Sequence, residues 1–255
     1  MLKNYLDSLP DTDKNVVAVL SGGLDSTVMT YLLAEKYGED RVFALSFNYG
    51  QKQKIELEKA EDTCMTIGCE HDIINLSVLG DIVRNVSANI GGTDVAMPTI
   101  QDVLGDPQPK TYVPFRNMIL NALAFSYAES NSASHIFTGL QVHDEYGYWD
   151  TTQKFVDSMN AVAAQNRTHS IKMEAPFSTL SKFQEIEIMK ELNLVDNLAN
   201  TMTCYNPNEA GESCGVCPSC SERIMNFAKA GLVDPIPYSR FIPWSDIIEK
   251  YTGVR

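Results

Sequence analysis

A run of small, polar and acidic residues at 21–27 (SGGLDST) follows an apolar, β-branched stretch and precedes a helical pattern. Ligands of parallel sheets bind at this junction, at the carboxyl end of a strand. The paired glycines let the backbone approach an anion and adopt positive φ. The N–H groups of the turn then point at the anion, and hydroxyls of Ser21, Ser26 and Thr27 can add donors. We expect a phosphate-binding loop, in which Asp25 can offer a carboxylate to Mg²⁺.

An ordinary strand-to-helix turn, with a serine or aspartate as the helix cap, would have a similar composition. The run is not the GxxxxGKS/T phosphate loop, because no lysine follows the glycines, and it is not the GxGxxG dinucleotide fingerprint. The expected nucleotide-binding residues form one stretch around the glycines. They are Leu20, Ser21, Gly22, Gly23, Leu24, Asp25, Ser26, Thr27, Val28, Met29 and Thr30.

Four cysteines near the C-terminus form a second group with chemistry of its own: Cys204, Cys214, Cys217 and Cys220. Four clustered thiolates suit tetrahedral Zn²⁺, and a closed four-cysteine site predicts a structural rather than a catalytic ion. An iron–sulfur cluster is the alternative, because thiolates also hold such clusters. Cys64 and Cys69 lie apart from this group, and we expect them to be packing residues.

The elements that position these groups alternate along the chain. Short apolar runs predict strands, and amphipathic segments predict helices. The expected strands are 16–20, 41–47, 71–76 and 134–140, and the expected helices are 26–37, 52–67, 117–129 and 152–165. This alternation predicts an α/β fold, a Rossmann-like open parallel sheet with helices on both faces.

Two segments depart from the alternation. Residues 78–110 hold several glycines and prolines without a sustained period, which predicts either a loop that covers the ligand or a disordered excursion. Residues 201–255 contain the cysteines and one expected helix near 221–229. We therefore expect a nucleotide-binding domain at 15–200, a zinc-binding helical appendage at 201–255 packed as one unit with it, and an N-terminal extension at 1–14.

The composition limits the partners. The chain has 255 residues, with 20 Lys plus Arg against 33 Asp plus Glu, and a net charge of −13. Nucleic acid is an unlikely main substrate, because a protein that binds a polyanion needs a basic face. No apolar stretch is long enough to span a membrane, and the N-terminus lacks the apolar core of a signal peptide. We expect a cytoplasmic protein that forms a homo-oligomer, most simply a dimer.

The two motifs together resemble one family. The SGGLDST run resembles the PP-loop of the ATP pyrophosphatases, and with the cysteines it resembles the 7-cyano-7-deazaguanine synthase family, QueC, over residues 16–227. Residues 47–53 (FNYGQKQ) are similar to the family's FxYGQK/RH segment, and 112–117 (YVPFRN) to its VPxRN segment. Residues 139–150 (GLQVHDEYGYWD) are similar to its GxxxxDxSGYPDCR segment.

The resemblance implies an ATP-dependent ligase that converts 7-carboxy-7-deazaguanine and ammonia to the 7-cyano compound through an adenylate and an amide. It also implies the use of ATP, Mg²⁺ and Zn²⁺. By this resemblance Ser21, Asp25, Ser26, Arg116 and Lys182 are the catalytic candidates, and Arg116 and Asn117 join the nucleotide site. The substrate candidates are Tyr49, Gln51, Asp144, Tyr148 and Asp150, of which Asp150 can accept from the N–H edge of a guanine-like ring.

Departures from the family pattern leave several functions open. Trp149, Thr151 and Thr152 replace the family's Pro, Cys and Arg, and Tyr146 replaces its Ser. A diverged member could stop at the amide or join the activated deazaguanine to another amine, even one on a protein. The chain could also be a different PP-loop enzyme, such as a tRNA thiolase or a synthetase, or a non-catalytic zinc-containing interaction module.

Overall fold

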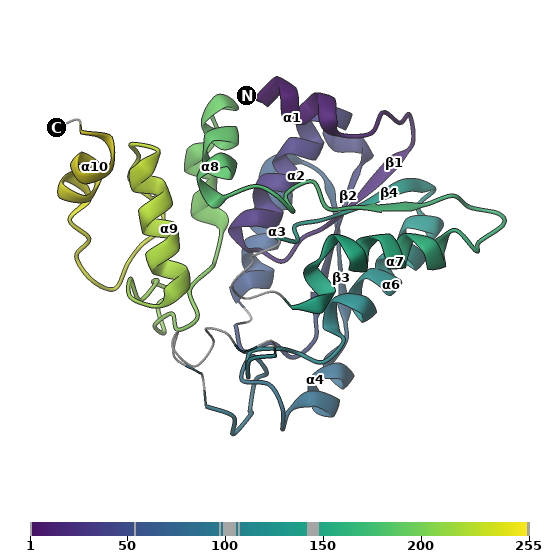
Figure 1. Ribbon diagram of the computed structural model, residues 1–255, viewed down its shortest axis with the longest axis horizontal. Coiled ribbons are helices and arrows are strands. Elements are labelled where there is room, and N and C mark those ends of the chain that lie inside the picture. The colour runs from purple at the N-terminus through teal and green to yellow at the C-terminus, as the bar shows by residue number, and fades with distance from the viewer. Residues whose placement is uncertain are drawn as a thin grey trace.

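One parallel sheet forms the centre of the computed structural model, which describes residues 2–53, 55–96, 98, 106, 108–141 and 148–253. Its strands lie in the order β3-β2-β1-β4-β5, and every neighbouring pair is parallel (Figure 1). They are β1 (Asn15–Val19), β2 (Val42–Asn48), β3 (Glu70–Asn75), β4 (Ala133–Thr138) and β5 (Lys172–Glu174).

Helices cover both faces of this sheet because successive side chains of a strand point to opposite sides. Val16 and Ala18 of β1 pack with α2 (Leu24–Tyr37), and α3 (Ile55–Ile67) lies on the same face. Val17 packs with α6 (Arg116–Ser130) on the other face. α7 (Gln153–Ala163) covers the β5 end of that face, through Phe155 and Val156 packed on Met173.

The strand order creates a switch point beside β1. The chain builds β1, β2 and β3 outward in one direction and then returns to place β4 on the other side of β1. The connections that follow β1 and β4 therefore diverge and leave a crevice between them. Open α/β sheets bind their ligands in such a crevice. The SGGLDST run follows β1 at this point.

The expected fold class is confirmed, and each expected strand and helix is present with its ends shifted by a few residues. Several further elements lie outside the expectation. They are α1 (Leu2–Ser8), α4 (Ser77–Val83), β5, α8 (Lys182–Glu191), α10 (Trp244–Thr252) and 3-10 turns at Glu39–Arg41, Trp149–Thr151 and Val195–Asn200. The segment at 78–110 is thus partly helical at its start. Within the expected covering loop at 78–110, residues 97, 99–105 and 107 lie outside the described residues.

A buried ion pair ties the C-terminal region to the rest of the chain. Arg223 of α9 (Pro218–Lys229) donates to both carboxylate oxygens of Asp234, at 2.7 and 2.9 Å. The same guanidinium donates to the Thr201 hydroxyl at 2.6 Å and to the Leu198 carbonyl at 3.1 Å. Losing one partner of such a buried pair costs about 3–5 kcal/mol. This network joins the 198–201 segment to α9, the helix that also carries Cys220.

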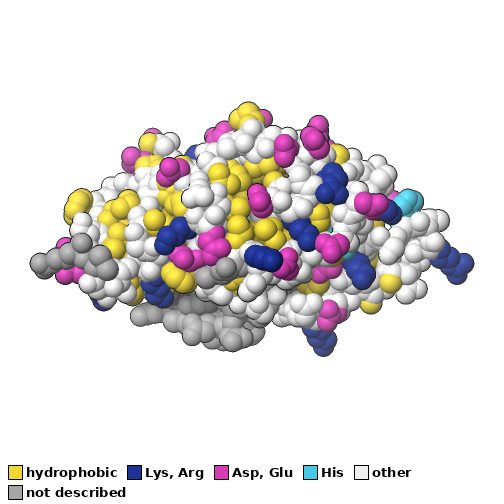
Figure 2. All heavy atoms as spheres, turned by 90° about the horizontal axis from the view of Figure 1, so that it is seen from above, with side chains coloured by type: hydrophobic (Ala, Val, Ile, Leu, Met, Phe, Trp, Pro, Cys, Tyr) yellow, Lys and Arg dark blue, Asp and Glu magenta, His cyan; other side chains and the backbone are white. Residues whose placement is uncertain are grey.

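Two further observations bear on what the chain can bind. In the described parts of the chain, no helix combines the length and the apolar character that crossing a membrane requires. On the face that Figure 2 shows, Lys and Arg side chains alternate with Asp and Glu and do not gather into one basic area.

Candidate active site

Gly22 turns the chain between β1 and α2. Its φ is +82°, a left-handed value that glycine adopts without a side-chain clash. A Cβ atom here would lie 1.9 Å from the carbonyl oxygen of Glu56 in α3. α2 begins one residue after Gly23, and no side chain caps this helix N-terminus. The first-turn N–H groups and the positive end of the helix dipole suit an anion, so the loop fits the phosphates of ATP.

Two serines fix the shape of this loop. The hydroxyl oxygens of Ser21 and Ser26 lie 3.0 Å apart, and the Ser21 backbone N–H donates to the Ser26 hydroxyl at 3.1 Å. The residue after β4 packs closely against the same place, since a Cβ atom on Gly139 would lie 3.1 Å from the backbone nitrogen of Ser26. The two connections of the switch point therefore meet at the start of α2.

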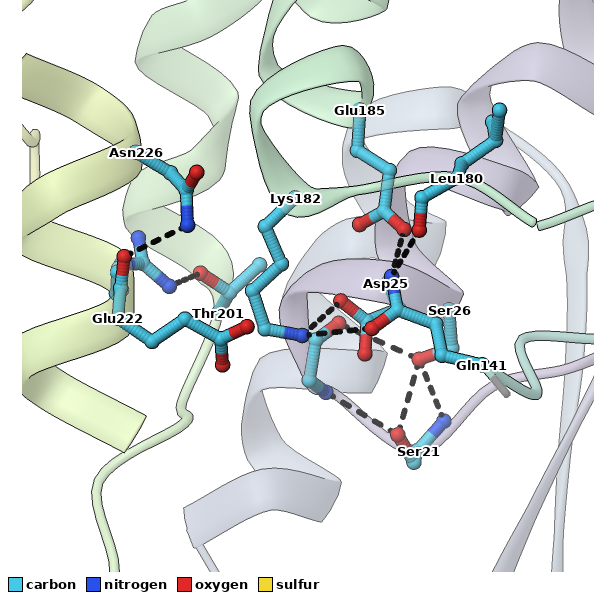
Figure 3. Close-up of polar contacts among 12 residues, drawn as sticks. Ser21, Asp25, Ser26, Gln141, Leu180, Lys182, Glu185, Thr201, Glu222 and Asn226 are labelled. Atoms are coloured by element: carbon cyan, nitrogen blue, oxygen red, sulfur yellow. Dashed lines mark hydrogen bonds and ion pairs between the residues drawn. The ribbon is translucent and has the colours of Figure 1, made fainter. Parts of the chain in front are cut away.

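Asp25 and Lys182 form an ion pair beside the loop (Figure 3). The Lys182 ammonium, on the first residue of α8, donates to Asp25 Oδ1 at 2.8 Å and to Gln141 Oε1 at 3.2 Å. Gln141 Nε2 donates in turn to the carboxyl of Glu185. Three side chains, those of Asp25, Gln141 and Glu185, thus meet around the buried cation of Lys182.

Burial and charge oppose each other at this ion pair. Burial works to lower the pKa of Lys182, but the charges of Asp25, Glu222 and Glu185 outweigh it and raise this pKa above its usual range. Burial also raises the pKa of Glu185 well above its usual range, and the nearby charge of Asp25 adds to that rise. The surrounding carboxylates therefore keep Lys182 in its charged form, and burial favours the protonated form of Glu185.

Part of the expected nucleotide-binding stretch faces the core. Leu24, Val28 and Met29 belong to the main hydrophobic cluster, and the Thr30 hydroxyl donates to the Ser26 carbonyl at 2.8 Å. The helical repeat explains this, because residues four apart share a face and α2 packs that face on the sheet. The structure thus places the side chains of these four residues in the buried interior, away from the loop.

A separate pocket lies near the loop, with a volume of about 210 Å³. The residues that line it come from four segments: Asn89, Thr111, Tyr112, Val113, Arg116, Tyr148, Asp150 and Tyr205. The rings of Tyr112 and Tyr148 stack with centroids 5.6 Å apart, and the hydroxyl oxygens of Tyr148 and Thr111 lie 2.7 Å apart. A larger hollow of about 1040 Å³ lies along α1 and β5, and none of the expected site residues lines it.

Opposite charges face this pocket. Asp150 is buried, and its Oδ2 accepts from the backbone N–H of Asn117 at 3.3 Å. Burial raises the pKa of Asp150, while the charge of Arg116 acts against that rise. Arg116 donates to the Tyr49 hydroxyl at 3.2 Å and lies over the Tyr49 ring. The lining of the pocket therefore offers both a carboxylate and a guanidinium, a combination that suits a flat ring with N–H donors and an anionic substituent.

The cysteines converge on one point. The ligand atoms of Cys204, Cys214, Cys217 and Cys220 all lie within 4.8 Å of one another, so this group could hold a metal ion. Backbone N–H groups point at the sulfurs. Cys214 donates to Cys204 Sγ at 3.2 Å, Cys217 to Cys214 Sγ at 3.3 Å and Cys220 to Cys217 Sγ at 3.4 Å. Such donors favour thiolate ligands, and the donor set therefore fits a metal.

Known proteins match most of the length of this chain. Residues 15–231 match the family model described as "Queuosine biosynthesis protein QueC". The chain belongs to the QueC family. The 7-cyano-7-deazaguanine synthase of Marinomonas sp. (strain MWYL1) is 38% identical over 226 residues, which cover 88% of this chain and 98% of that protein. The enzyme of the same name from Oceanobacillus iheyensis is 36% identical over 233 residues, which cover 89% and 99%.

A solved structure shows a more distant likeness. The U34-tRNA thiolase NcsA from Methanococcus maripaludis is 18% identical, with a TM-score of 0.46, and the match covers 99% of this chain and 77% of that one. A likeness at this level carries no argument about function.

The remaining substrate candidates of this QueC-family chain have different surroundings. Tyr49 contacts Arg116 through the hydrogen bond already described. Gln51 is buried, and its amide accepts from the Tyr49 N–H at 3.0 Å and donates to the Phe47 carbonyl at 3.1 Å. It therefore shapes its own turn and does not line the pocket. Asp144 falls outside the described residues.

The site of this QueC-family chain also contains residues that sequence reasoning missed. Tyr112 and Tyr205 line the pocket, and Gln141 and Glu185 surround Lys182. Glu56 connects the two sites. Its carbonyl lies against Gly22, and burial raises the pKa of its carboxyl to about 7, against the charge of Arg116. One signal could have found Glu185, because it follows Lys182 at the i,i+3 spacing that puts two side chains on one helix face.

Proposed function

We propose that this chain is an ATP-dependent 7-cyano-7-deazaguanine synthase that uses 7-carboxy-7-deazaguanine and ammonia. Family membership supports this function. The observation that carries it is a pocket that places Asp150 and Arg116 among stacked tyrosines, next to a loop suited to phosphates. Two different sites, one for a nucleotide and one for a small flat anion, are what such a ligase requires.

The substrate fits the pocket in one orientation. A deazaguanine ring offers adjacent N–H donors on one edge, which the Asp150 carboxylate can accept, and flat faces that suit the tyrosine rings. Its 7-carboxylate lies on the opposite side of the ring system and needs a cation. Arg116 lines the pocket and, among the described residues, has no carboxylate within ion-pair distance. We therefore assign Arg116 to the substrate carboxylate and to the adenylate made from it.

The loop residues would serve the other substrate. Ser21, Ser26 and the N-terminal N–H groups of α2 would hold the phosphates of ATP, and Lys182 would balance their charge. Asp25 would share its carboxylate between Lys182 and Mg²⁺. The carboxylate of the deazaguanine attacks ATP, pyrophosphate leaves, and ammonia displaces AMP to give the amide. A second ATP adenylates the amide oxygen with release of pyrophosphate, and loss of AMP, which carries away that oxygen, and of a proton leaves the nitrile.

The cysteine cluster would hold one structural Zn²⁺ through Cys204, Cys214, Cys217 and Cys220. The ion supplies folding free energy to the C-terminal region when bound, and a closed set of four thiolates leaves no position for a reacting water. The domain boundaries at 14/15 and 200/201, a cytoplasmic location and a dimer stay predictions.

Mass spectrometry of the products tests the proposal directly. Purified chain is incubated with 7-carboxy-7-deazaguanine, ATP, Mg²⁺ and ammonium, and the acid, amide, nitrile and protein adduct are told apart by mass. The nitrile is the expected product. Accumulation of the amide alone, or a deazaguanine-modified protein, would replace the proposal with a diverged activity of the same site. Unchanged acid, without pyrophosphate release, would reject it.

A further inference from the structure

The segment at 202–205 touches three sites within four residues. The Met202 backbone N–H donates to the Gly22 carbonyl of the phosphate loop at 2.9 Å. Cys204 belongs to the cysteine cluster, and Tyr205 lines the 210 Å³ pocket. Because Cys204 and Tyr205 are adjacent in the chain, the cysteine cluster is directly connected to a residue that lines the proposed substrate pocket.

The two ends of this segment are anchored differently. On the N-terminal side, Arg223 holds Thr201, and the Thr63 hydroxyl donates to the Asn200 carbonyl at 3.3 Å. On the C-terminal side, the backbone bonds go to sulfur, since Asn206 and Cys214 donate to Cys204 Sγ at 3.3 and 3.2 Å. The first set of anchors involves no sulfur atom, whereas the second is formed by groups that a metal would draw together.

We propose that the four-cysteine site acts in substrate binding, by holding Tyr205 as one wall of the deazaguanine pocket. This inference rests on the proposed function, because it takes the pocket as the deazaguanine site. Tyr112 and Tyr148 stack on each other through contacts of their own. Tyr205 is about half exposed (46%) and projects from a loop next to a ligand cysteine. Loss of the metal should therefore loosen the Tyr205 wall and spare the stacked pair.

The first test measures equilibrium binding with three tyrosine variants. Dissociation constants for 7-carboxy-7-deazaguanine and for ATP are measured separately on the full-length, zinc-loaded chain. Tyr205→Ala should weaken deazaguanine binding about fivefold or more, because stacking on one aromatic ring is lost. Tyr205→Phe should bind like the wild type, since it keeps the ring. Tyr251→Ala is the matched control, a tyrosine of similar exposure (41%) on α10 outside the pocket.

The second test removes the metal. Cys217→Ser, or chelation of the wild type, should raise the dissociation constant for 7-carboxy-7-deazaguanine by a factor similar to that of Tyr205→Ala and change ATP binding less. Adding Tyr205→Ala to Cys217→Ser should cause little further loss, because both changes remove the same wall. Retained ATP binding shows that the sheet is still folded. If Cys217→Ser does not fold, chelation of the wild type and of Tyr205→Ala decides the role of the metal.

The outcomes separate this inference from the proposed function. Deazaguanine binding that is equally tight with and without metal, or unaffected by Tyr205→Ala, overturns the inference and leaves the synthase activity standing. Equal losses of ATP and deazaguanine affinity would make the cluster a general structural element and would also overturn it. A wild-type chain that binds ATP but not 7-carboxy-7-deazaguanine refutes the proposed function itself.

Discussion

The phosphate loop takes its groups from one stretch, residues 20–27, whereas the neighbouring pocket is assembled from side chains at 89, 111–116, 148–150 and 205. The loop works mainly through backbone N–H groups, a helix dipole and a glycine at φ +82°. The pocket works through one carboxylate, one guanidinium and aromatic faces. A substitution in the loop should therefore impair catalysis whatever substrate the enzyme activates. A substitution in the pocket should impair recognition of the deazaguanine.

The largest effect that this comparison predicts is at Asp25. Asp25→Asn keeps the size of the side chain and removes its charge, which should lower kcat by about a thousandfold, as for other electrostatic groups at reacting centres. Pyrophosphate release measures the rate. Asp25→Ala should in addition destabilise the fold by about 3–5 kcal/mol, because it removes the oxygen acceptor that the Asn amide still offers to the buried Lys182. Asp40→Asn, at an exposed position, is the control. Wild-type turnover by Asp25→Asn would remove Asp25 from the mechanism.

A smaller effect, a loss of folding stability, is expected from substitution in the glycine pair. Gly22→Ala places a Cβ atom 1.9 Å from a backbone oxygen at a left-handed φ, so we expect the midpoint of thermal unfolding to fall, with a loss of about 3–4 kcal/mol. Gly23→Ala is the matched control. Its φ is −79° and its new Cβ would meet the Ser21 hydroxyl at 3.3 Å, so it should cost much less. Equal stability of the two variants would contradict the left-handed conformation and close packing of Gly22.

The pocket predicts a selective effect. Asp150→Asn should raise KM for 7-carboxy-7-deazaguanine about ten- to a hundredfold and leave KM for ATP nearly unchanged, because an amide presents a donor where the ring needs an acceptor. The amide oxygen can still accept from the Asn117 N–H, so the start of α6 should survive. Initial rates at varied concentrations of each substrate measure the split. A variant with weakened ATP and unchanged deazaguanine kinetics would move Asp150 to the nucleotide site.

The same comparison explains what the sequence can and cannot predict. The fold class, the SGGLDST loop and the cysteine cluster are patterns of adjacent residues, and local rules of spacing are enough to predict them. The side chains of Val28, Met29 and Thr30 are buried in the fold, which a linear stretch does not show, because the helical repeat decides which side chains turn toward the core.

The pocket can be predicted only in part. The resemblance to the family indicates Arg116, Tyr148 and Asp150, because each lies in a recognisable segment. Tyr112 lies in the same segment as Arg116, but its place in the pocket beside Tyr205 is set only when the sheet brings distant connections together. The segment around Gln51 predicts a side chain that faces the substrate, but the Gln51 amide closes the turn in which it lies.

The smallest predicted effect is at Glu56, which belongs to both regions. Its carbonyl lies against Gly22, and its carboxyl feels the charge of Arg116. Burial raises the pKa of this carboxyl from 4.5 to about 7. Between these values the folded chain binds more protons than the unfolded chain, so the free energy of unfolding must fall as the pH rises. The contribution is fully present below pH 4.5 and is lost as the pH rises through about 7.

Glu56→Gln should abolish this loss, because the amide stays neutral at every pH. The variant should gain about 1–2 kcal/mol over the wild type between pH 4.5 and pH 8, after allowance for the partial exposure of the side chain. Urea unfolding at several pH values measures the difference, and Glu58→Gln, an exposed position on the same helix, is the control. Parallel pH curves for Glu56→Gln and the wild type would mean that Glu56 is solvated, and that the loop and the pocket are joined through its backbone alone.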